Sequence, residues 1–140
     1  MIKIESEINI SEPEFSIKRA PLEFGKNVCD LKYLIEMMGF KKPLIKGIMD
    51  AFLKQVPEEL ECIHDAIEKR DYQIIRNFAH TMKSSVSIMG ISTLTPILQE
   101  MEDLGASETN MEKIKELNEE LNLICTQATQ EIEKEKHNYI

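Results

Sequence analysis

Hydrophobic residues recur every three or four positions along most of the chain beyond residue 27, and this period is typical of amphipathic α-helices. The first such segment begins at Val28 and ends before Gly39, a residue type that favours helix termination. Asn27 and Asp30 are candidate N-caps for this helix. Its apolar positions are Val28, Leu31, Leu34, Ile35 and Met38.

Two longer periodic segments follow, over residues 42–69 and 71–89. Pro43 suits the first turn of the earlier segment, because a backbone N–H has no helical partner there. Pro57 lies in the interior of the same segment and predicts a kink or a local break. The later segment ends at Gly90, where we expect a left-handed backbone conformation.

The remaining periodic segments predict two more helices. One starts with Ser92 or Thr93 as its cap and ends at Gly105. The other runs from about Glu108 to the C-terminus, and its Glu- and Lys-rich outer face is expected to be solvated. Short loops separate these helices, and four of them are long enough to pack lengthwise. We therefore predict an all-α fold, an antiparallel four-helix bundle with an additional short N-terminal helix.

The beginning of the chain lacks this helical period. The stretch "IKIESEINI" alternates loosely between apolar and polar residues, and Pro13 and Pro21 follow it. We expect residues 1–27 to form an N-terminal arm or linker. Residues 28–140 are expected to form one helical domain, which suits a chain of 140 residues.

Charge and composition exclude several classes of function. The formal net charge is −8, so phosphate backbones and anionic lipids repel the chain, and we expect no nucleic-acid binding. The sequence has no run of roughly 18 apolar residues and no signal peptide, so we expect neither membrane insertion nor secretion. The three cysteines form no C-x-x-C pair and are expected to be free thiols in a reducing cytoplasm.

One polar stripe of the helix over residues 71–89 carries candidate chemistry. Its members, at helical spacing, are Arg76, His80, Lys83, Ser84 and Ser87. A lone histidine on a polar helix face is usually only solvated. Here, however, small Ser84 leaves the imidazole open to a bulky partner, and the two cations attract an anion. The pattern therefore favours a phosphoryl-accepting nucleophile, with Lys83 able to hold phosphoryl oxygens.

The segment "AHTMKSSVSIMG" resembles the signature of histidine-containing phosphotransfer (HPt) domains. The matching residues are Ala79, His80, Met82, Lys83, Ser85, Met89 and Gly90. The flanking segments "FLKQVPEELECIHDAIEKRD" and "LTPILQEMEDLG" are similar to the family's preceding and following helices, so the resemblance covers about residues 30–130. The chain departs from the family at Ser84, where a glycine is usual. We expect serine to keep access to the imidazole but to narrow it, and thus to affect partner affinity more than chemistry.

The resemblance implies a role for each site residue. His80 would be phosphorylated at Nε2, Lys83 would contact the phosphoryl group, and Ser84 would border the access to His80. Glu102 would orient the imidazole through Nδ1, and a carboxylate there would leave Nε2 as the free nucleophile. Gln99, one turn earlier, is a rival for the role of Glu102. A plain surface acid is the other interpretation of Glu102.

The resemblance also implies the function. The chain would be a phosphorelay intermediate of two-component signalling that accepts a phosphoryl group from a receiver-domain aspartate and passes it to another. Its partners would be response-regulator receiver domains, such as the receiver of a hybrid sensor histidine kinase, and Mg²⁺ would be bound by the receiver. The chain itself would bind no cofactor. It lacks a nucleotide-binding glycine loop, so it is no kinase, and the term enzyme applies only loosely.

Two alternatives stay open at this point. The first is a catalytically silent helical module that docks receiver or kinase domains without accepting phosphate. The serine at position 84 is the feature that supports this alternative. The second is a metal-binding bundle, suggested by the Glu-x-x-His spacing of Glu61 and His64. Such a site needs a second copy of the motif, and none exists, so we expect no metal.

His137 is expected to be solvated. A further hypothesis places a docking patch on the first helix, at Tyr33, Met37 or Phe40.

Overall fold

The computed structural model describes residues 27–139, and this range contains helices and no strand. The predicted division at residue 27 stays a prediction, because residues 1–26 lie outside the described range. The helices are α1 (Lys32–Met37), α2 (Lys42–Glu68), α3 (Tyr72–Ile88), α4 (Leu94–Ser107), α5 (Met111–Lys136) and the 3₁₀ helix η1 (His137–Tyr139).

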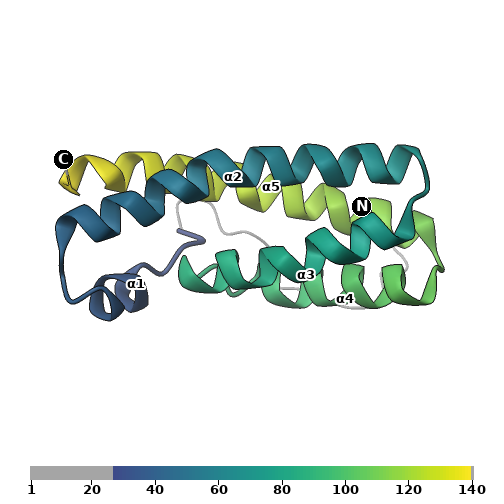
Figure 1. The fold of residues 1–140 in the computed structure, drawn as a ribbon, viewed down its shortest axis with the longest axis horizontal. Coiled ribbons are helices and arrows are strands. Elements are labelled where there is room, and N and C mark those ends of the chain that lie inside the picture. The colour runs from purple at the N-terminus through teal and green to yellow at the C-terminus, as the bar shows by residue number, and fades with distance from the viewer. Residues whose placement is uncertain (1–26, 140) are drawn as a thin grey trace, which may run out of the picture.

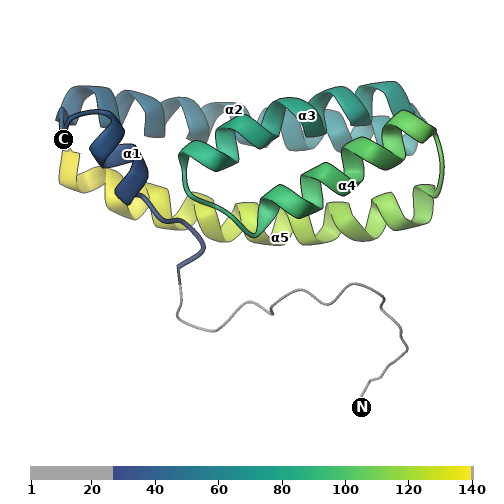
Figure 2. The same cartoon turned by 90° about the horizontal axis from the view of Figure 1, so that it is seen from below.

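The four long helices form an antiparallel bundle in which each runs opposite to the one before it (Figure 1). Contacts join α2 to α3, α3 to α4, α4 to α5 and α5 back to α2, so the helices close into a ring. Short α1 lies at the end of the bundle where α2 begins and α5 ends (Figure 2). The predicted fold class, a four-helix bundle with an additional short N-terminal helix, is confirmed.

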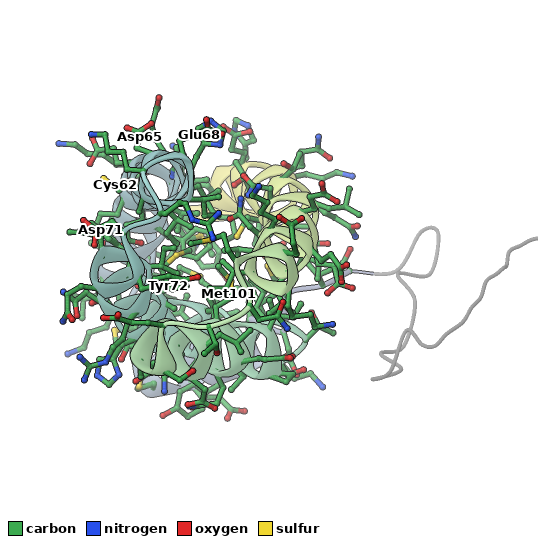
Figure 3. All side chains as sticks on the ribbon, turned by 90° about the vertical axis from the view of Figure 1, so that its right-hand side faces the viewer. Cys62, Asp65, Glu68, Asp71, Tyr72 and Met101 are labelled. Atoms are coloured by element: carbon green, nitrogen blue, oxygen red, sulfur yellow. The ribbon has the colours of Figure 1, made fainter. Side chains whose placement is uncertain are left out.

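Seen from its end, the bundle encloses apolar side chains between the four helices, while charged side chains project outward (Figure 3). The predicted apolar stripes supply this core, and most of its members are completely buried. Removing such side chains from water is the main favourable term in folding. The fully buried members with the largest side chains are Leu34, Ile45, Met49, Ile63, Ile75, Met82, Met89, Ile91, Leu94, Ile97, Leu98 and Met101.

Pro57 and Gly105 interrupt their helices less than predicted. α2 continues through Pro57, so the predicted local break does not occur. α4 continues through Gly105 to Ser107, so the prediction that Gly105 ends this helix was wrong. Gly105 is instead buried against α3. A Cβ atom at this position would lie 3.0 Å from both the Cβ atom of Arg76 and the backbone oxygen of Tyr72.

Capping also differs in part from the predictions. Asp71 caps α3, since its side chain accepts a hydrogen bond from the N–H of Ile74. Neither predicted cap of α4 acts through its side chain: Thr93 occupies the N-cap position without a side-chain bond. α5 begins later than expected, after Asn110, whose side chain accepts from the N–H of Lys113.

The first helix is shorter than predicted, because the chain before Lys32 is held in another way. Glu131 on α5 accepts hydrogen bonds from the backbone N–H groups of Val28 (2.7 Å) and Cys29 (2.9 Å). The N–H of Asp30 donates to the carbonyl of Gly90 at 3.1 Å. Gly90 has the expected positive φ, +67°, and a Cβ atom there would overlap the backbone of Asp30. These bonds fix residues 28–30, and with them the start of α1.

Gly105→Ala is expected to destabilise the protein. Alanine favours a helix over glycine by about 1 kcal/mol, but its methyl group would collide with the backbone of α3, and overpacking costs about 1–3 kcal/mol. We expect the free energy of unfolding in urea to fall by about 1–2 kcal/mol.

Gly47→Ala in α2 is the matched control, because nothing lies within 4 Å of a Cβ atom there. This variant should gain about 0.5–1 kcal/mol from helix propensity alone. Equal stability changes in the two variants would contradict the close packing of α3 against α4.

Candidate functional site

His80 projects from the middle of α3 beside α4. The buried residues Ala79 and Met82 fix the rotation of α3 about its axis, and that rotation turns His80 away from the core. The His80 side chain is 68% exposed. The predicted polar stripe is present: Arg76, Ser84 and Ser87 are exposed as well, and Lys83 is partly buried.

Glu102 on α4 lies against both His80 and Lys83. One carboxylate oxygen, Oε2, is 2.9 Å from His80 Nδ1, and the other, Oε1, is 2.7 Å from Lys83 Nζ. An ionised carboxylate can only accept hydrogen bonds, so the neutral imidazole in this geometry carries its proton on Nδ1. The other ring nitrogen, Nε2, then keeps a free electron pair.

The pKa of Glu102 is lowered from its ordinary value, chiefly by the hydrogen bond from Lys83, against a smaller opposing effect of desolvation, and further by the bond to His80. A carboxyl group with a depressed folded pKa stabilises the fold above its unfolded pKa, and this contribution is lost as the pH falls through the folded pKa. Glu102 is therefore ionised near neutral pH and can bind both partners.

Lys83 has a second acceptor on α4. Its Nζ donates to Gln99 Oε1 at 2.8 Å, and Gln99 Nε2 donates to Asp103 Oδ1 at 3.0 Å. Gln99, the rival of Glu102 in the sequence, thus contacts the lysine, whereas Glu102 contacts the imidazole. Asp103 was missed by the sequence analysis, although its position four residues after Gln99 places both on one face of α4.

The other candidates lie elsewhere. Glu61 and His64 line a shallow groove between α2 and α5, together with Glu119 and Leu123. Within residues 27–139, no group of three His, Cys, Asp or Glu side chains is arranged to hold a metal ion. In the same range, no helix is both long enough and apolar enough to span a membrane. His137 is exposed in η1, at the far end of α5.

The fold and this site define a histidine phosphotransfer module, and comparison with known proteins agrees. The family model described as Hpt domain matches residues 47–134, which include His80, Lys83 and Glu102. This match covers more than half of the chain, so the chain belongs to the Hpt domain family. The resemblance found in the sequence is thereby confirmed, and with it the general assignment to histidine phosphotransfer in two-component signalling.

A solved structure is similar in fold. It is the crystal structure of histidine-containing phosphotransfer protein B (HptB) from Pseudomonas aeruginosa PAO1, with a TM-score of 0.74 and 21% sequence identity. The similarity covers 80% of this chain and 96% of that chain. No curated protein sequence matches this chain.

Glu102→Ala is expected to change the tautomer of His80. Without the carboxylate, nothing holds the proton on Nδ1, so the population of the Nε2–H tautomer should rise. Nitrogen-15 chemical shifts of the ring, recorded at a pH where the imidazole is neutral, measure this population. Glu119→Ala on α5 is the control and should leave the ring shifts unchanged. The same tautomer ratio in Glu102→Ala and in the unmodified protein would refute the role of Glu102.

Proposed function

We propose that this protein is a phosphorelay intermediate, which accepts a phosphoryl group on His80 from a receiver-domain aspartate and passes it to the aspartate of another receiver. The observation that carries the proposal is the hydrogen bond between Glu102 and His80 Nδ1. It leaves Nε2 unprotonated on a side chain that is 68% exposed. A nucleophile that serves a folded partner must combine these two properties.

The transfer step is a displacement at phosphorus. The electron pair of His80 Nε2 attacks, a P–N bond forms, and the P–O bond to the receiver aspartate breaks with its electron pair leaving on that carboxylate. The ring keeps its Nδ1 proton and becomes positively charged. The negative charge of Glu102 stabilises this ring, and transfer to the second receiver reverses the step. Mg²⁺ on the receiver and Lys83 would offset the charge of the phosphoryl oxygens.

An exposed apolar patch on and after α1 is a candidate docking surface for the receiver. The patch consists of Tyr33, Met37, Phe40 and Leu44, whose exposed fractions are 59%, 43%, 69% and 50%. Phe40 also has a positive φ of 60°, which is uncommon for a bulky residue. Apolar side chains gathered at one end of an otherwise charged surface are typical of interaction sites.

Phosphoryl transfer to His80 tests the proposed function. The donor is a phosphorylated receiver domain or a small phosphoramidate, and the acceptors are the unmodified protein and His80→Gln. We expect acid-labile, alkali-stable label on the unmodified protein alone, since a phosphoramidate bond has this stability. His64→Gln and His137→Gln serve as controls and should accept label normally.

Two outcomes would contradict the proposal. Label on both the unmodified protein and His80→Gln would assign the acceptor role to another histidine. Label on neither, with receivers still bound, would favour the silent docking module that the serine at position 84 keeps open.

Tyr33→Ala and Met37→Ala test the docking patch separately. Both side chains are exposed, so their truncation should leave the free energy of unfolding within about 0.5 kcal/mol. We expect transfer from the receiver to slow severalfold through weaker docking, while labelling by the small phosphoramidate is unchanged. Leu123→Ala, at an exposed leucine on α5, is the control. Unchanged transfer rates with every receiver tested would exclude a role for this patch in docking.

A further inference from the structure

The ammonium group of Lys83 is bound on the side of the site that faces α4. Its two acceptors are Glu102 Oε1 at 2.7 Å and Gln99 Oε1 at 2.8 Å. Glu102 Oε1 is the carboxylate oxygen that does not contact the imidazole. Only 24% of the Lys83 side chain is exposed. The lysine in this structure is therefore occupied by residues of α4.

Asp103 determines which end of the Gln99 amide meets Lys83. A carboxylate only accepts hydrogen bonds, so the NH₂ group of Gln99 faces Asp103, and the amide oxygen is left for Lys83. An ammonium group only donates, so it requires that orientation. Asp103, Gln99, Lys83, Glu102 and His80 thus form one continuous chain of polar contacts.

We infer that Gln99, oriented by Asp103, is a positioning residue that holds Lys83 on Glu102 until a phosphoryl group on His80 draws the lysine away. The inference rests on the proposed function of His80 as phosphoryl acceptor. No covalent bond changes in this step: Lys83 exchanges one set of acceptors, the oxygens of Gln99 and Glu102, for the phosphoryl oxygens.

Charge gives the direction of the exchange. A phosphoryl group on His80 Nε2 adds negative charge within one helical turn of Lys83. An ammonium group binds an anionic phosphoryl oxygen more strongly than a neutral amide oxygen. Once Lys83 leaves Glu102, the carboxylate is no longer shared. Its full charge then acts on the positively charged, phosphorylated ring through Nδ1–H. The exchange thus stabilises the phosphoryl oxygens and the ring together.

Gln99 therefore stabilises the unphosphorylated protein and not the phosphorylated one. Its removal should shift the equilibrium of transfer toward phosphorylated His80. The bond is a charge-assisted one at a partly exposed site, for which we expect a shift of about three- to tenfold in the equilibrium constant.

The test compares Gln99→Leu with Gln73→Leu, the same substitution at an exposed glutamine of α3. Each variant is equilibrated with a phosphorylated receiver, and the label on His80 and on the receiver is measured. The phosphorylated fraction should rise in Gln99→Leu and stay unchanged in Gln73→Leu. Asp103→Asn should shift it in the same direction, but less. In a Lys83→Met background, Gln99→Leu should have no effect, since the residue it positions is gone.

A second readout needs no phosphoryl group. Carbon-13 titration of the Glu102 carboxyl should give a higher midpoint in Gln99→Leu than in the unmodified protein, because Lys83 is held less tightly. An unchanged midpoint together with an unchanged transfer equilibrium would overturn the inference. The inference would also be overturned if Gln99→Leu still raised the phosphorylated fraction in the Lys83→Met background. If no variant accepted label, the proposed function and the exchange would both be wrong, whereas the titration would still decide whether Gln99 holds Lys83.

Discussion

The close approach of α3 and α4 is the constraint on which the site depends. Because Gly105 has no side chain of its own, the backbone of α4 can lie directly against Tyr72 and Arg76 of α3. One turn along each helix from this crossing, Glu102 meets His80 at hydrogen-bond distance. A wider separation would leave the carboxylate short of Nδ1, and the imidazole would then be a freely rotating surface group. The packing of two helices thus also fixes the orientation of the imidazole.

The site combines a rigid support with an open reaction face. Glu102 is mostly shielded, while the ring that it orients is mostly exposed. Burial at the supporting carboxylate strengthens its contacts, and exposure at the ring lets a whole protein domain reach Nε2. The proposed docking of a receiver domain requires this division, because the ring must stay open to the partner while Glu102 keeps it oriented.

Much of this structure could be predicted from the sequence, because helical periodicity identifies both the core and the stripe that contains His80. The resemblance selected Glu102 over Gln99 as the partner of the imidazole, but the residue pattern by itself could not decide between them. Both lie on the same face of α4, three residues apart, and only the rotation of α4 against α3 decides which one reaches the imidazole. Gly105 was misread for a related reason. Glycine ends helices and also permits close helix packing, and a single sequence does not distinguish these uses. Asp103 was missed because its side chain contacts Gln99, and a single sequence does not show which neighbour a surface carboxylate meets.

The attachment of residues 28–30 has an evolutionary consequence. Glu131 and Gly90 bind backbone groups of this segment, and those groups are the same whichever side chains it carries. Substitutions on the outer surface of α1 therefore leave its anchorage intact. The outer surface of α1 can diversify while His80, Glu102 and the bundle stay constant. A phosphotransfer module built in this way can change its outer surface without altering the histidine site.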